Sequence, residues 1–141
     1  MSTPNSLFAI TVAMRARLAA MPNNIASYFE GEGQPQFTNP SPFQTVTLIP
    51  ATPANPTLNS DYYREEGVLR IRLFYPNREG VGAILTQAER IREWFPRGTT
   101  VIHDNIKTIV RLTPSISGTS VINDKLSLVV DITYFTSVYV C

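Results

Sequence analysis

Residues 75–99 read YPNREGVGAILTQAERIREWFPRGT, and this stretch decides the fold because it predicts a strand end, one complete helix and its stop. Asn77 can cap the helix by accepting hydrogen bonds from the first free amide groups. Glu79 adds a negative charge to the first turn, where the helix dipole favours one. Pro96 and Gly98 are typical of a helix end. We therefore expect a helix that begins after Asn77 and ends near Phe95.

The apolar residues of this helix recur at spacings of three and four, which predicts a single buried stripe. The stripe consists of Val81, Ile84, Leu85, Ala88, Ile91 and Phe95. The polar residues Gln87, Glu89, Arg90 and Glu93 fall on the other side, where we expect solvent. Gly80 and Gly82 are too few for a phosphate-binding loop, and we expect them to allow a close approach of the helix to the sheet or to a neighbour.

Three segments alternate between apolar and polar residues, as half-buried strands do. In residues 68–75 the apolar face is Leu69, Ile71, Leu73 and Tyr75. In residues 107–113 it is Val110 and Leu112, and Pro114 stops the strand. In residues 125–140 it is Leu126, Leu128, Val130, Ile132, Tyr134, Val138 and Val140. Sixteen residues is long for one strand, which predicts a bend or a projecting end near Thr136 and Ser137.

The opposite face of these strands also carries apolar residues, which suggests burial against a second layer or another subunit. The residues concerned are Val68, Phe74, Val129, Phe135 and Tyr139. The alternative is that aromatic and β-branched residues suit strands wherever they lie.

The N-terminal part predicts one further helix and a short strand. Ser6 can cap a helix with an apolar stripe, and residues 22–24 end it. The stripe is Leu7, Ile10, Met14, Leu18 and Met21. Residues 25–30 read as a strand.

Residues 34–60 form an extended excursion that holds six of the eleven prolines. Only residues 43–49 within it have strand character. The excursion is either a surface loop or an arm that docks on a neighbour through Phe37, Phe43 and Leu58.

Length and composition indicate one domain, residues 1–141, with one core. No charge-poor run approaches the roughly 20 residues of a membrane span, and we expect no membrane. Cys141 is the sole cysteine, so an intramolecular disulfide is excluded. A net charge of +1 gives no overall positive field that would attract nucleic acid.

Residues that could carry chemistry are scarce, and we expect neither catalysis, metal nor cofactor. His103 is the one histidine, and Asp104 beside it reads as a turn between residues 101–102 and 106–112. The neighbours Glu65 and Glu66 point to opposite faces of a strand, so with Asp61 they read as solvated surface charges. We predict no enzyme.

The order of these segments resembles the tail terminator family of long-tailed phages. The most specific part combines GVLRIRLFYPNREGVGA at 67–83 with IREWFPRGT at 91–99, because the strand, the glycine-containing helix start and the Phe-Pro-x-Gly stop follow the family's order. Residues 123–126 depart from the family, whose relatives often carry a Gly-Trp or aromatic turn there.

The resemblance implies a structural subunit of a ring, hexameric in the siphophage relatives, that caps the tail tube and stops its polymerisation. Its implied partners are further copies, the major tail tube protein and the head-completion or connector protein. DNA would pass through the ring without sequence-specific binding. The implied location is the head-proximal end of the virion tail, after assembly in the host cytoplasm.

We therefore predict an α+β fold with a mostly antiparallel sheet of about four to six strands and two helices packed on one face. The interface candidates are the residues of the second sheet face and of the arm: Val68, Phe74, Val129, Phe135, Tyr139, Phe37, Phe43 and Leu58. The alternative function is a non-enzymatic adaptor that captures a partner with its Pro-rich arm.

Overall fold

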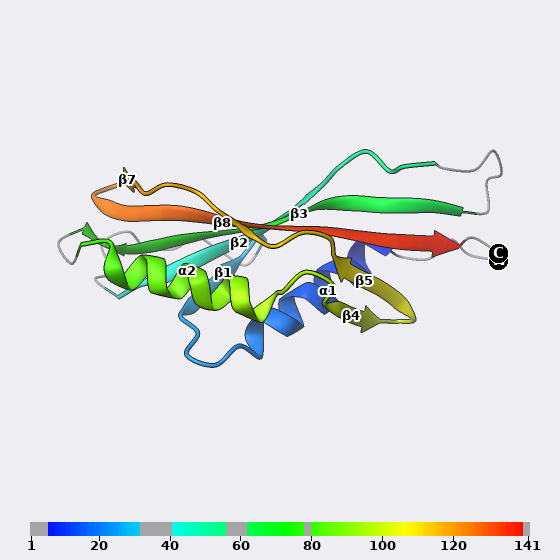
Figure 1. Ribbon diagram of the computed structural model, residues 1–141, viewed down its shortest axis with the longest axis horizontal. Helices are drawn as coiled ribbons and strands as arrows, with labels where there is room; N and C mark the ends of the chain where they lie inside the picture. Colours follow the sequence, from blue (N-terminus) through cyan, green and yellow to red (C-terminus); the bar gives the residue numbers. More distant parts are fainter. Residues whose placement is uncertain (1–5, 32–40, 56–61, 78–79, 140–141) are drawn as a thin grey trace.

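The computed structural model describes residues 6–31, 41–55, 62–77 and 80–139 (Figure 1). The fold is α+β, as predicted. Its helices are α1 (Ser6–Ala19) and α2 (Gly82–Trp94). Its strands are β1 (Ala26–Phe29), β2 (Phe43–Pro50), β3 (Tyr62–Pro76), β4 (Thr100–His103), β5 (Ile106–Val110), β6 (Ser115–Ile116), β7 (Ser120–Ile122) and β8 (Lys125–Tyr139).

The strands of the described residues form one sheet of eight, in the order β1-β2-β3-β8-β5-β4. All pairs are antiparallel except β1 with β2. One edge of β8 pairs with β3, and the other pairs with β5, β6 and β7 at successive positions. The count exceeds the predicted four to six because β6 and β7, of two and three residues, are too short to show periodicity.

The two longest strands, β3 and β8, form the centre of the sheet. Their register runs unbroken from Tyr62 opposite Tyr139 to Pro76 opposite Lys125. Since no residue is left over, β8 contains no bulge at Thr136 and Ser137. The start of β3 and the end of β8, which pair with each other, instead extend beyond the β4–β5 hairpin (Figure 1). Of the predicted bend and projecting end, the structure therefore has the projecting end. Val140 lies outside the described residues.

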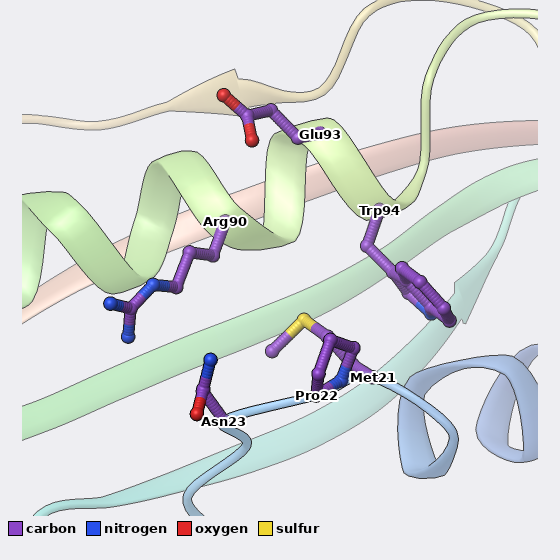
Figure 2. Close-up of a pocket in the computed structure, with 6 residues that line it drawn as sticks. All are labelled: Met21, Pro22, Asn23, Arg90, Glu93 and Trp94. Carbon is purple, nitrogen blue, oxygen red and sulfur yellow. The ribbon is translucent and has the colours of Figure 1, made fainter.

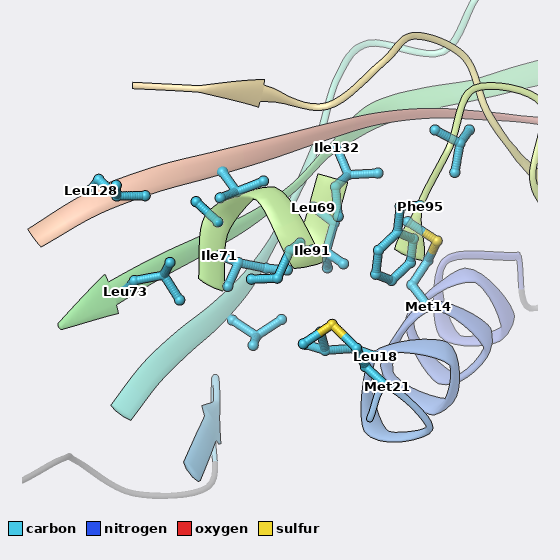
Figure 3. Close-up of a cluster of buried hydrophobic side chains, with 14 of the residues drawn as sticks. Met14, Leu18, Met21, Leu69, Ile71, Leu73, Ile91, Phe95, Leu128 and Ile132 are labelled. Atoms are coloured by element: carbon cyan, nitrogen blue, oxygen red, sulfur yellow. The ribbon is translucent and has the colours of Figure 1, made fainter. Parts of the chain in front are cut away.

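One apolar core joins the helices to a face of β3 and β8 (Figure 3). The predicted strand faces are buried, with Leu69, Ile71 and Leu73 at 1% exposure or less. Helix α1 contributes Ile10, Met14 and Leu18, and α2 contributes Ile84, Ala88 and Ile91. Each of the larger side chains stabilises the fold by about 1.5–3 kcal/mol on burial.

The two helices are also joined end to end by a reciprocal contact. The Arg17 guanidinium donates to the Trp94 carbonyl at 2.6 Å, and the Trp94 indole Nε1 donates to the Arg17 carbonyl at 2.6 Å. The same guanidinium lies 4.7 Å from the Trp94 ring centroid. This contact fixes where α2 ends relative to α1.

Several predicted details of α2 are wrong. The helix begins at Gly82, and Val81 takes the cap position without a side-chain hydrogen bond, so Asn77 is not the cap. Gly80 has φ +71°, an angle that a right-handed helix does not contain, so the helix can begin only after Gly80. A Cβ at Gly80 or Gly82 would meet no atom within 4 Å, so neither glycine serves a close approach within the chain.

Gln87 was expected on the solvent side but is only 2% exposed. It lies three residues after Ile84 and four before Ile91, so it completes their ridge once the helix faces the sheet along that line. Val81 and Leu85, predicted in the stripe, lie on the outward side instead.

Two further apolar residues are not where the sequence suggested. Leu7 of α1 is exposed, because Ala9 and Ala13 let the helix approach the sheet on their side. Leu112 is also exposed, because β5 ends at Val110 and the chain turns away before Pro114. The predicted β4–β5 turn is confirmed, with Asp104 and Asn105 both at positive φ.

The excursion of residues 34–60 contributes directly to the sheet. Within it β2 pairs with β3 over eight positions and buries Phe43, Gln44 and Val46. Phe37 and Leu58 lie outside the described residues, so the choice between loop and docking arm stays a prediction.

Candidate functional site

The face of the sheet opposite the core, here called the second face, is the candidate site. Strict alternation along β3 and β8 places Val68, Arg70 and Arg72 on it, facing Thr133, Asp131 and Val129 of the neighbouring strand. No helix of the described residues contributes to the core from that side.

The sequence-predicted candidates differ in how much surface they present. Val68, Val129 and Phe135 are half-buried, and Tyr139 is 68% exposed. Phe43 and Phe74 are only 2% and 3% exposed, with ring centroids 4.8 Å apart. Their rings are therefore mostly buried within the chain, and little of either remains for a partner.

Sequence reasoning missed three apolar residues of this face. Ile49 of β2, Ile109 of β5 and Ile102 of β4 share it, because Ile49 pairs with Val68, Ile109 with Phe135 and Lys107 with Ile102. Together with the predicted residues they form a line across five strands. We call it the apolar belt: Ile49, Val68, Phe135, Ile109 and Ile102. The alternation signal was present for Ile49, but the order of the strands was needed to join the line.

The charged groups beside the belt are unevenly paired. Arg70 makes a two-pronged ion pair with Asp131, Nε to Oδ1 at 2.9 Å and Nη2 to Oδ2 at 3.1 Å. This contact raises the pKa of Arg70. Arg64 lies 5.5 Å from the Phe135 ring centroid and only 3.9 Å from Glu66, while its buried Nε has no hydrogen-bond partner. Arg64 thus has no close ion pair among the described residues.

The projecting end carries two tyrosines that pack against each other. The ring centroids of Tyr62 and Tyr139 are 4.9 Å apart, and the Tyr62 hydroxyl is 3.0 Å from the Ser137 hydroxyl. That hydrogen bond is the main cause of a lowered pKa at Tyr62. The projecting end of β3 and β8 is therefore aromatic, and its side chains are joined by a ring contact and a hydrogen bond.

Glu65 was predicted to be a solvated surface charge, and this is wrong. It is 7% exposed, because β3 extends to Tyr62 and the alternation that buries Leu69 also buries Glu65. Burial raises its pKa, partly opposed by a hydrogen bond with Ser6. Nearby, burial and the Glu65 charge raise the pKa of Tyr134 to about 12. Glu66 faces the other way, as expected, and Asp61 lies outside the described residues.

A groove of about 300 Å³ lies between the turn after α1 and the last turns of α2 (Figure 2). Its lining residues are Met21, Pro22, Asn23, Arg90, Glu93 and Trp94. It holds one carboxylate and one guanidinium, and its lining contains no serine, threonine, cysteine, histidine or lysine.

No trio of histidine, cysteine or acidic side chains in the described residues is placed to hold a metal ion. His103 lies at the β4–β5 turn, 3.4 Å from Asp104 and in edge contact with Phe8. Among the described helices, none has the length and apolar content needed to cross a membrane.

The comparisons with known proteins agree with this picture. The family model described as phage tail terminator protein matches residues 9–134. One solved structure, whose name states no function, is similar with a TM-score of 0.73 at 14% identity, covering 94% of this chain and 96% of its own. At that identity the likeness shows the fold alone. None of the curated proteins gives a significant match. The match to the family model spans most of the sequence, and the chain belongs to the phage tail terminator protein family.

Proposed function

We propose that the protein forms a ring that caps the phage tail tube, stops its polymerisation and offers a docking surface to the head connector. The family match over residues 9–134 carries the proposal, since the family is a structural one of phage tail assembly. The ring is a hexamer at the head-proximal end of the tail, built in the host cytoplasm. DNA passes through it without sequence-specific contacts.

The second face supports this proposal as the surface between subunits. An apolar line across five strands is more than scattered surface residues, and such a patch on a sheet is typical of an interface. Among the sequence-predicted candidates, Val68, Val129, Phe135 and Tyr139 keep surface available for this role.

Phe135→Asp tests the assignment. The carboxylate would lie in a contact where water is excluded, at a cost of several kcal/mol to assembly. The monomer should still fold, because Phe135 faces away from the core. In an infection that lacks the normal protein, this variant should give tails of uncontrolled length or tails that do not join heads, as seen by electron microscopy of the lysate.

Asn123→Asp is the control, since it adds a negative charge at the exposed turn between β7 and β8, where aspartate tolerates the positive φ. Normal tails with Phe135→Asp would remove this residue from the interface. Normal virions without the protein would contradict the terminator function itself.

The alternative is an adaptor whose Pro-rich arm, including Phe37 and Leu58, captures a partner. The mass of the protein in solution separates the two. A discrete ring favours the terminator, whereas a chain that stays monomeric in the presence of tail tubes favours the adaptor.

A further inference from the structure

The outward side of α2 carries an exposed ridge that no part of the described chain covers. Val81, Leu85, Glu89 and Glu93 follow one another at intervals of four, so they lie in one row along the helix. All four are exposed. We call this row the α2 ridge.

The charges of the α2 ridge are unpaired within the described residues. Glu89 and Glu93 lie four residues apart, which places like charges side by side and disfavours the helix slightly. The nearby arginines are engaged elsewhere: Arg90 donates to the Gln87 side chain at 3.4 Å, and Arg92 donates to the Pro114 carbonyl at 3.0 Å. The ridge is therefore apolar at one end and acidic at the other.

The second face has the complementary character. Its apolar belt is flanked by Arg64, whose side chain is 41% exposed and lies 3.9 Å from the Glu66 carboxylate, and by the exposed Lys107, which forms no ion pair in the described chain. The exposed part of an arginine side chain that lies over an aromatic ring can bind an incoming carboxylate.

The dimensions are similar as well. The ridge spans twelve residues of helix, about 18 Å at 1.5 Å per residue. The belt crosses from β2 to β4 over four strand spacings, about 19 Å at 4.8 Å each, and advances four residues along the strands, about 13 Å, so its length is about 23 Å.

We propose that the α2 ridge of one copy packs on the apolar belt of the next copy, with Glu89 and Glu93 against Arg64 and Lys107. The two surfaces are different and belong to opposite layers of the molecule, so the contact is head-to-tail and closes into a ring when the rotation between copies allows it. This inference rests on the proposed ring function.

The exposed residues of α1 do not fit this role. Leu7 and Phe8 are exposed, but α1 contains no acidic residue and would bring Arg15 and Arg17 towards a face that is already basic. Phe8 also contacts His103 within the chain. Charge thus selects α2 over α1 as the partner of the belt.

Charge reversal tests the pairing in an infection that lacks the normal protein. The ridge variant Glu89→Lys/Glu93→Lys and the belt variant Arg64→Glu/Lys107→Glu should each give overlong or headless tails, with at least a tenfold loss of infectious particles. In the variant with all four changes, every ridge–belt pair again joins opposite charges, with the signs exchanged. This variant should recover most of the infectious particles. Arg97→Glu, at an exposed position that forms no ion pair within the described residues, is the control and should behave as the normal protein.

Mixing the purified variants tests the head-to-tail arrangement. Each variant alone brings like charges together and should stay monomeric. In a mixture, every contact between alternating copies joins opposite charges, either in the normal or in the reversed sense, so the two variants together should form rings of equal composition, as measured by native mass. Melting curves of each variant check that it folds, and Lys107→Glu alone serves as the belt variant if Arg64→Glu does not fold.

The outcomes separate the inference from the function. Normal tails with the ridge and belt variants, no recovery in the fourfold variant, or no ring in the mixture of the two variants would each overturn the pairing of these two surfaces. Tails that need no terminator protein at all would instead refute the proposed function.

Discussion

Ile91→Ala is the most direct test of how α2 is held on the sheet. Ile91 is fully buried in the core beside Phe95 and Leu69 (Figure 3). The change removes three carbon atoms, worth about 2.4 kcal/mol at about 0.8 kcal/mol each. The cavity left behind adds to this loss, so we expect the free energy of unfolding to fall by about 3–4 kcal/mol, within the range for such changes of about 2–5 kcal/mol.

The matched control is Leu85→Ala on the same helix. It removes the same number of carbon atoms, but Leu85 is 38% exposed on the outward side. We expect a loss of no more than about 1 kcal/mol. Gln87→Ala, which the sequence alone would offer as the exposed control, is unsuitable because Gln87 is buried.

Urea unfolding measures both effects at a concentration where the protein is monomeric. With a slope of about 1–3 kcal/mol per molar urea, Ile91→Ala should lower the midpoint by about 1–4 M. A shift for Ile91→Ala no larger than that for Leu85→Ala would refute the assignment of the buried side of α2.

Three further predictions concern Gly67, the buried Glu65 and the excursion of residues 34–60. Gly67→Ala should destabilise by about 1–3 kcal/mol in thermal unfolding, because its Cβ would lie 2.5 Å from the Ile49 carbonyl oxygen and 2.6 Å from the Tyr134 hydroxyl; wild-type stability would contradict this packing. The raised pKa of Glu65 contributes stability that is complete below the ordinary pKa of glutamate and is lost as the pH rises through the higher value of the folded state. Glu65→Gln should therefore flatten the fall in urea midpoint above about pH 4, and an unchanged pH profile would refute the burial effect. Shortening residues 34–40 while keeping β2 should preserve the cooperative melt seen by circular dichroism but weaken self-association or partner binding seen by light scattering; loss of the melt would assign those residues to the core.

Local pattern was sufficient for the main elements. Alternation in residues 68–75 and 125–138 predicted which side chains of β3 and β8 are buried, because a strand has only two faces. The same rule gave Val68, Val129 and Phe135 as residues of the second face. The helix at 82–94 was also visible from its period, although its start was not, because Gly80 and Val81 replace the cap that Asn77 would have supplied.

Errors arose where one residue type suits two environments. Gln87 and Glu65 look like surface residues by chemistry alone, yet each lies in register with buried neighbours. Leu85 and Val81 look like core residues but follow a ridge that the helix turns outward. A helix period defines a stripe about a third of the surface wide, and only packing chooses its centre.

The sequence by itself determined the long strands, the two helices except for the start of α2, and which residues share each strand face, because these depend on contacts a few residues apart. Only the tertiary structure decided that Ile49, Val68, Phe135, Ile109 and Ile102 form one line, because they come from five strands whose order in the sheet is not written in any local period. It also decided that α2 presents Glu89 and Glu93 outward, while the partly exposed Arg64 lies on the other layer. A surface consists of residues distant in the chain, and these residues become neighbours only when packing of the core fixes the positions of their helices and strands.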